Sequence, residues 1–231
     1  MRIWHQGFVE LETVPRYVEA LERHVRAVAS PGTTVDLHGL RRGTYTPGRT
    51  AADLARDPTL RPLGVAQVVE NAVRAEREGY DAVAITIVQD LGLREARAQV
   101  RIPVAGYGEA AMRAAAETGP FAVVAFDHGI AGEIDREIGA LGLAGRALAT
   151  ELVDTDYGGV VEAFEHPERL ASALAAAARR AVARGARAIV PGQTIMAEAL
   201  WQHGVRGVDG IPVVDALGVT IAAAERMARG G

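Results

Sequence analysis

The chain has 231 residues, of which 49% are hydrophobic and 23% charged, and its formal net charge at pH 7 is −4. This composition is typical of a globular protein with a buried core, and the acidic balance argues against nucleic acid or an anionic membrane surface as the main partner. No apolar run reaches the roughly 18 residues of a membrane span and the first residues lack a signal-peptide pattern, so we expect a cytoplasmic protein.

Short apolar runs alternate with longer helical patterns along the whole chain. In the first half we predict strands at residues 1–4, 33–37, 82–87 and 103–107, and helices at residues 15–29, 65–78 and 109–117. In the second half we predict strands at residues 121–126, 148–153, 188–190 and 212–214, and helices at residues 130–141, 167–184, 196–203 and 216–228. This alternation is typical of an α/β protein whose parallel sheets are covered by helices.

The connection at residues 40–62 is long and polar, with several glycines and prolines. Loops of this length in a compact domain often form a binding loop or a lid. We therefore expect this segment to be a loop near the site.

The sequence contains a weak internal repeat. Residues 79–87 can be laid on residues 185–193 at an offset of 106, and residues 102–104 on residues 211–213 at an offset of 109. Two landmarks at nearly the same offset indicate one structural unit present twice. We predict two pseudo-symmetric parallel-sheet α/β domains, residues 1–105 plus 211–231 and residues 106–210. Because ligands bind beyond the carboxyl ends of parallel strands, we expect the site in the cleft between the domains.

Three of the six histidines follow predicted strands, namely His5, His38 and His128. A histidine at such a position can move protons near neutral pH or bind a metal. No compact metal-binding motif is present, so we predict neither a metal nor another cofactor. The candidate acid–base residues are His5, His38, His128 and Asp127, whereas we expect His24, His166 and His203 at the surface.

Other polar residues at the predicted strand ends are suited to holding a substrate. Gln193 and Thr194 precede a helix, whose free N–H groups bind a carboxylate or an enolate oxygen, and Thr86 can add a hydroxyl donor. We expect the partner to be a small-molecule substrate. The candidate substrate-binding residues are Gln6, Tyr45, Thr86, Ile87, Gln89, Asp90, Tyr107, Gln193 and Thr194.

Four stretches of the chain resemble the aspartate/glutamate racemase superfamily, especially its hydantoin and allantoin racemase branch. They are residues 79–93, 102–111, 189–197 and 211–215, and within them Asp90-Leu91-Gly92-Leu93 is similar to the Asp-Pro-Gly-Leu turn of that branch. The resemblance implies two pseudo-symmetric α/β halves and an isomerase that acts at an acidic carbon of a small carboxylate or cyclic amide. It also implies a homo-oligomer.

The chain departs from the family in its proton carriers. The family's chemistry uses two cysteines, one in each half, but this chain has no cysteine, and the matching positions are Ile87 and Gln193. The family's Asn-Pro-Asn-Thr segment is replaced by residues 5–8, His-Gln-Gly-Phe. We therefore expect a cysteine-independent isomerase in which histidine, with Asp127 or Asp90 nearby, moves protons. Two alternatives are a decarboxylase or other lyase, and a non-catalytic protein that binds a small acid.

Overall fold

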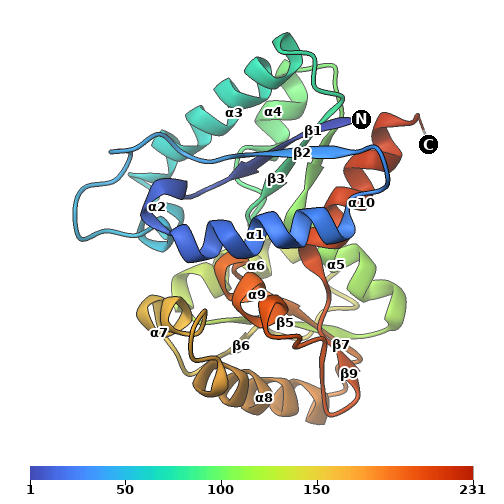
Figure 1. Cartoon of the computed structure of the whole chain (residues 1–231). Coiled ribbons are helices and arrows are strands. Elements are labelled where there is room, and N and C mark those ends of the chain that lie inside the picture. The colour runs from blue at the N-terminus through green and yellow to red at the C-terminus, as the bar shows by residue number, and fades with distance from the viewer. Residues whose placement is uncertain (231) are drawn as a thin grey trace. The chain divides into compact units, whose positions relative to one another are not determined.

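The computed structural model describes residues 1–230, which form two compact units (Figure 1). Unit 1 comprises Met1–Tyr107 and the chain from Leu217 onward, and unit 2 comprises Gly108–Ala216. Each unit has its own parallel sheet, of four strands in unit 1 and three in unit 2. Within residues 1–230, none of the helices combines the length and the apolar character that crossing a bilayer requires.

The sheet of unit 1 has the strand order β2-β1-β3-β4 and is parallel throughout. Because β1 and β3 are central in this order, their residues are almost all buried. In the register, Trp4 pairs with Asp36 on one side and with Val83 on the other. The strands are β1 Arg2–Gly7, β2 Thr34–His38, β3 Ala82–Thr86 and β4 Val104–Gly106.

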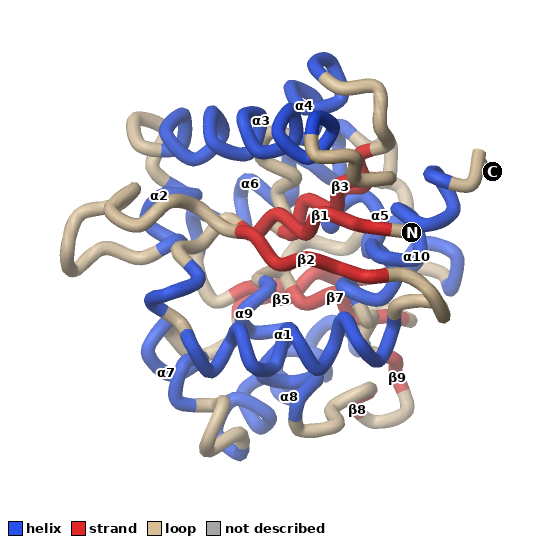
Figure 2. Tube along the Cα trace, turned by 45° about the horizontal axis from the view of Figure 1, so that its top comes forward, coloured by secondary structure: helices blue, strands red, loops and turns tan. Residues whose placement is uncertain are grey.

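Helices cover both faces of this sheet. Figures 1 and 2 show α3 and α4 on one face and α1 and α10 on the other. Side chains alternate along a strand, so Trp4 and Gln6 face α3 whereas His5 faces the opposite side. On the α3 side, Trp4 belongs to a buried apolar cluster that also contains Ile87. The helices of unit 1 are η1 Leu11–Thr13 (a 3-10 helix), α1 Pro15–Val28, α2 Ala51–Arg56, α3 Arg61–Arg77, α4 Leu93–Gln99 and α10 Ala216–Ala228.

The sheet of unit 2 has the strand order β6-β5-β7 and is also parallel. Its strands are β5 Phe121–Ala125, β6 Glu151–Leu152 and β7 Ala188–Pro191, and a separate antiparallel pair is formed by β8 Gly207–Val208 and β9 Ile211–Pro212. The helices are α5 Tyr107–Thr118, which begins at the boundary between the units, α6 His128–Ala140, α7 Tyr157–Glu162, α8 Glu168–Ala183 and α9 Thr194–Gln202.

The strand register reproduces the internal repeat of the sequence. In unit 1, β3 pairs with β1 on one side and, through Val83 and Val104, with β4 on the other. In unit 2, β7 pairs with β5 on one side and, through a single parallel bridge between Ile189 and Val213, with the chain after β9 on the other. The offsets from Val83 to Ile189 and from Val104 to Val213 are the 106 and 109 residues found in the sequence. The predicted α/β fold with two parallel sheets is confirmed.

The predicted strand at residues 212–214 is confirmed only in part, because β9 ends at Pro212 and Val213 makes a single bridge. The regular pairing there is antiparallel, between β8 and β9, and only Val213 makes a parallel bridge. The cause is the turn between these strands, in which Asp209 and Gly210 have φ angles of 50° and 82°. Two successive positive φ angles form the type I′ turn of a tight hairpin, which folds β9 back on β8.

The predicted loop at residues 40–62 contains regular structure. Thr50 caps α2, since its side chain accepts a hydrogen bond from the Asp53 N–H while the Asp53 carboxylate accepts one from the Thr50 N–H. This capping box starts a helix inside the loop. Helix α3 begins at Arg61 rather than at residue 65, with Pro62 in its first turn, a position that suits proline.

Other sequence predictions need smaller corrections. The predicted strand at residues 148–153 is reduced to the two residues of β6. Helix α7 was not predicted at all. His24 is not a surface residue, because it lies on the inward face of α1 with Tyr17 and Leu21 and is buried.

Candidate active site

A buried histidine–threonine pair lies at the carboxyl edge of the unit 1 sheet. His5 is on β1 and Thr86 is the last residue of β3, and neither side chain is more than 2% exposed. His5 Nε2 lies 2.8 Å from Thr86 Oγ1, and the same hydroxyl can donate to the Gln6 carbonyl at 3.2 Å. Within the described residues, His5 Nδ1 makes no aligned hydrogen bond. Thr86 directly precedes Ile87 in the chain, so the pair lies at the carboxyl end of the central strands.

Burial keeps His5 neutral. The pKa of His5 is lowered from 6.5 to about 4, chiefly because the ring is removed from water; the backbone carbonyl of His38 raises this pKa in part, and the charge of His38 acts in the lowering direction. At neutral pH the imidazole therefore has one protonated nitrogen and one lone pair. A neutral ring bonded to a hydroxyl can take up a proton through that hydroxyl.

The turn after β3 is tightly built around Asp90. The Asp90 backbone has a φ of 48°, its N–H donates to the Ile87 carbonyl at 2.9 Å, and its carbonyl accepts from the Leu93 N–H at 2.9 Å. The carboxylate packs against Gly106 at the end of β4, where an added Cβ would lie 2.7 Å from Asp90 Oδ1. Asp90 is buried. It therefore joins the ends of β3 and β4 and helps to fix Ile87.

Gln89 and Ile87 have different surroundings in this turn. Ile87 packs in the apolar cluster of unit 1. The Gln89 side chain is 7% exposed, yet its Nε2 has no hydrogen-bond partner in the part of the chain that the structure describes. A buried amide donor without a partner costs about 1–3 kcal/mol, so Gln89 is a candidate for contact with a ligand.

The buried side chain of Gln6 uses its amide in hydrogen bonds within unit 1. Its Oε1 accepts from Trp4 Nε1 at 3.1 Å and from Asn71 Nδ2 at 2.9 Å, and its Nε2 donates to the Gly7 carbonyl at 2.8 Å. These contacts tie β1 to α3 and leave the amide little capacity to bind a substrate.

The His38 ring lies away from the His5–Thr86 pair. It stacks on Trp4 with ring centroids 3.3 Å apart, and its Nδ1 lies 3.0 Å from the Asp36 carbonyl. Since Trp4 and His5 face opposite sides of the sheet, the His38 ring lies on the α3 side. Burial lowers the pKa of His38, and the nearby Arg74 lowers it further. Stacking and hydrogen bonding give His38 a packing role.

The two tyrosines of the predicted site are held within unit 1. Tyr107 is buried at the start of α5, directly after β4. Tyr45 is partly buried and makes two hydrogen bonds with Glu10, a carboxylate that is only 3% exposed. Glu10 was not among the predicted site residues. Its position just past the end of β1 is the same kind of signal that identified Asp127 after β5.

In unit 2, the predicted residues follow the neighbouring strands β5 and β7. Gln193 is the N-cap of α9 and Thr194 is the first residue of that helix. The Phe126 N–H donates to Gln193 Oε1 at 3.4 Å, which orients the amide, and Gln193 Nε2 has no partner among the residues described. Gln193 is 8% exposed. The start of α9 therefore combines free helix N–H groups with a buried amide donor, and such a site suits an oxygen with negative charge.

Asp127 and His128 lie at the start of α6. Asp127 is the N-cap of this helix, and its Oδ1 accepts from the Ile130 N–H at 3.0 Å. His128 is exposed. Capping accounts for the position of Asp127, and the His128 imidazole is accessible to solvent.

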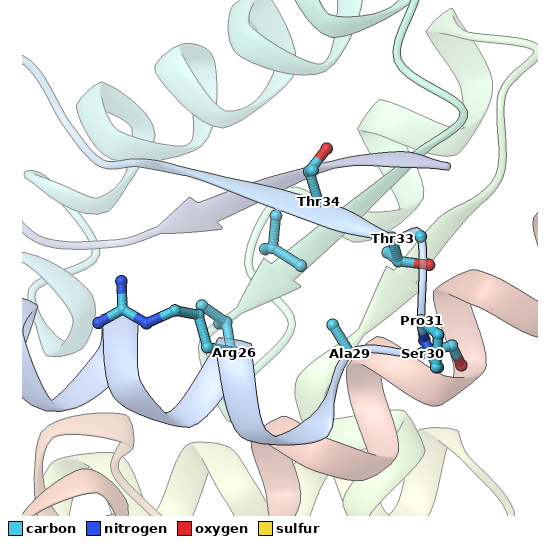
Figure 3. Close-up of a pocket in the computed structure, with 9 residues that line it drawn as sticks. Arg26, Ala29, Ser30, Pro31, Thr33 and Thr34 are labelled. Atoms are coloured by element: carbon cyan, nitrogen blue, oxygen red, sulfur yellow. The ribbon is translucent and has the colours of Figure 1, made fainter.

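Two further features lie apart from these residues. A surface pocket of about 390 Å³ lies between the end of α1 and the start of β2, at the amino edge of the sheet, with Arg26 and Thr34 on its rim (Figure 3). The pocket contains none of the predicted site residues, and both the N–H and the hydroxyl of Ser30 are bonded to Glu225. Within residues 1–230, no three His, Asp or Glu side chains gather closely enough to hold a metal ion.

Comparison with known proteins identifies one family. The sequence model of the family described as "Asp/Glu/Hydantoin racemase" matches residues 7–224. A search of curated proteins finds no match to the chain.

Several solved structures are similar to the chain over its whole length. The allantoin racemase from Klebsiella pneumoniae has a TM-score of 0.82 and 22% identity, and the match covers 100% of this chain and 89% of that one. The allantoin racemase from Pseudomonas fluorescens has a TM-score of 0.78 and 26% identity, with coverage of 100% and 92%. An aspartate racemase from Picrophilus torridus has a TM-score of 0.64 and 10% identity, with coverage of 99% and 94%.

Proposed function

The chain belongs to the Asp/Glu/hydantoin racemase family, and we propose that it is an isomerase that acts at an acidic carbon of a small carboxylate or cyclic amide without cysteine. The observation that carries this proposal is the 2.8 Å contact between His5 Nε2 and Thr86 Oγ1, directly before Ile87. Ile87, which matches the position of the family's first cysteine, follows Thr86 directly in the chain, and its side chain packs on the α3 side of the sheet, opposite to His5.

The pair supports a proton relay. With Nδ1 protonated, His5 Nε2 can accept the proton of the Thr86 hydroxyl while Thr86 Oγ1 takes a proton from the carbon acid. The proton leaves carbon, the hydroxyl is restored, and the positive charge rests on the imidazolium. Return of the proton by the same route completes the exchange. A threonine beside a neutral histidine has the geometry of an activated hydroxyl in general acid–base catalysis.

The start of α9 supports binding of the substrate oxygen. Deprotonation next to a carbonyl or carboxylate places negative charge on oxygen, and this charge needs fixed donors. Gln193 Nε2, the Thr194 hydroxyl and the first N–H groups of α9 can supply them. A neutral amide at Gln193 binds an anion without taking the proton, which suits the replacement of the second thiol by a binding group.

The proposal is tested by proton NMR of the full chain in D₂O with a panel of hydantoins, 2-amino acids and malonates. We expect deuterium uptake at the α-carbon of at least one substrate. His5→Gln and Thr86→Val should slow the uptake by at least about 100-fold, the usual contribution of general acid–base catalysis, whereas Thr86→Ser keeps the hydroxyl and should retain most of it. Unchanged exchange in both His5→Gln and Thr86→Val would refute the relay, and loss in His128→Ala alone would assign the proton transfer to His128.

A lyase is the second candidate, and the asymmetry of the two units favours it. In unit 1, His5 pairs with Ala84, and the residue that matches Ala84 in unit 2 is Val190. Val190 pairs with Val123, so a valine occupies the position in unit 2 that matches His5. A proton carrier on one side only delivers the proton to one face of a carbanion. Loss of a carboxyl group from a prochiral malonate, giving a product of one handedness, would support the lyase over the isomerase.

A further inference from the structure

Glu10 is a buried carboxylate that the proposed reaction does not use. It lies three residues past the end of β1, and its side chain and backbone both contact Tyr45. The Glu10 N–H donates to the Tyr45 hydroxyl at 3.2 Å, and the Tyr45 N–H donates to Glu10 Oε1 at 3.2 Å. Two reciprocal bonds fix both the ring and the backbone of a loop residue, and the second is charge-assisted whenever the carboxyl is ionised.

A second anchor holds the same loop from α3. Gln67 is buried, and its Oε1 accepts from the Arg41 N–H at 2.8 Å while its Nε2 donates to the Thr44 hydroxyl at 2.9 Å. The Leu40 N–H also donates to the Val9 carbonyl at 2.8 Å, which extends the pairing of β1 and β2 beyond the sheet. Residues 40–45 are therefore fastened over the carboxyl ends of these two strands.

The rest of the loop has few contacts with the fold. Residues 46–49 are exposed, and Gly48 has a φ of 84°. The Arg49 N–H donates to the Thr46 carbonyl within the loop, and the Arg49 guanidinium lies 3.9 Å from Asp57. Exposed pairs of this kind contribute little stability. Beyond Tyr45, the loop thus depends on its anchors for its position.

Tyr45 connects this loop to the candidate active site. Its ring packs against the apolar cluster of unit 1, which includes Phe8, Leu40 and Ile87. Ile87 follows the His5–Thr86 pair directly. Tyr45 and Ile87 therefore pack in the same apolar cluster.

We propose that residues 41–50 form a flap over the carboxyl edge of the unit 1 sheet, and that Glu10 is the residue that positions it. Glu10 acts through Tyr45, which it holds against the cluster that contains Ile87. The role of the flap in substrate binding rests on the proposed function, whereas the latching of the flap by Glu10 does not. Residues 41–50 open when either of the two Glu10–Tyr45 bonds is lost, and the substrate is then held less tightly.

Limited proteolysis of the full chain with trypsin tests the latch directly, because the exposed Arg42 and Arg49 lie in the flap. We expect Glu10→Ala to accelerate cleavage after these two residues by about tenfold, as the loss of a hydrogen bond to a charged group would. Glu10→Gln keeps the acceptor oxygen and should be cleaved at close to the wild-type rate. Glu70→Ala is the matched control, because it removes an exposed carboxylate that lies 2.8 Å from Arg41 on the same flap. We expect no more than about a twofold effect in this control.

Three results would overturn the proposal. They are wild-type cleavage in Glu10→Ala, equal acceleration in Glu10→Ala and Glu70→Ala, and acceleration spread over arginines outside the flap. If Glu10→Ala does not fold, Tyr45→Phe serves instead, since it removes only the acceptor of the Glu10 N–H. Acceleration confined to Arg42 and Arg49 in Tyr45→Phe would support the latch, and its absence would refute it.

Measurement of kcat and KM with a substrate from the D₂O panel distinguishes a role of Glu10 in positioning the flap from a general loss of structure in the variant. A loosened flap should raise KM at least about fivefold in Glu10→Ala with little change in kcat, and Glu10→Gln should restore KM. A fall in kcat with unchanged KM would contradict a positioning role. If no substrate exchanges, the proposed function fails, but the proteolysis result still decides whether Glu10 latches the flap.

Discussion

Ile87 and Gln193 occupy matching places in the two units but differ in their surroundings. Ile87 packs into an apolar cluster, whereas Gln193 is buried with an amide donor that has no partner in the described part of the chain. Burial of such a donor costs about 1–3 kcal/mol, so an apolar residue would serve the fold better at this position. The cost is explained when the amide binds a ligand, and this favours a binding role for Gln193.

The lowered pKa of His5 leads to a prediction about how the free energy of unfolding depends on pH. Its folded pKa is about 4, below the 6.5 of the unfolded chain, so the unfolded state binds more protons between these values. The free energy of unfolding should therefore be highest above pH 6.5 and should fall as the pH drops toward 4, by roughly 2 kcal/mol between pH 7 and pH 5 from this residue. Urea unfolding at these two pH values measures the fall. His5→Gln lacks this contribution, and an identical pH dependence in the variant would contradict the assigned pKa.

The helices and strands that were predicted incorrectly from the sequence lie where a tight turn or a helix cap sets the local structure. The Asp-Gly pair at residues 209–210 is a strong hairpin signal, yet the apolar run after it resembled a parallel strand. Thr50 and Asp53 form a capping box inside a segment whose glycines and prolines indicated a loop. Local hydrogen bonds outweighed composition in both cases. Most long elements, such as α1, α8 and β5, were predicted correctly from their periodicity.

The missing side-chain cap of helix α9 leads to a prediction about stability and substrate binding. Gln193 is its N-cap but makes no capping bond with its side chain. Gln193→Asp should cap the helix and raise the free energy of unfolding by about 1 kcal/mol, while its negative charge should abolish binding of an anionic substrate. Urea unfolding and the α-proton exchange rate measure the two effects. Gln193→Ala, which gains no cap, is the control, and a Gln193→Asp protein that keeps full exchange would contradict the binding role.

Across the whole molecule, the internal repeat could be predicted from the sequence and the side-chain directions could not. The repeat depends on backbone pairing, and the register reproduces its offsets. The role of a polar residue depends on neighbours that are distant in sequence. Asn71 and Trp4 engage the Gln6 amide, and stacking on Trp4 turns His38 away from the His5–Thr86 pair. No spacing in the sequence indicates these contacts.

The central claim is that this member of the family moves a carbon-bound proton through a buried neutral histidine. The most direct test is the pH dependence of kcat/KM for α-proton exchange, measured between pH 8 and pH 5 on a substrate that exchanges. Since the pKa of His5 is about 4, the ring stays neutral over this range, and we expect kcat/KM to remain nearly constant down to pH 5. A loss of about tenfold per pH unit below 6.5 would show that a histidine with an ordinary pKa carries the proton, and would contradict the assignment of His5.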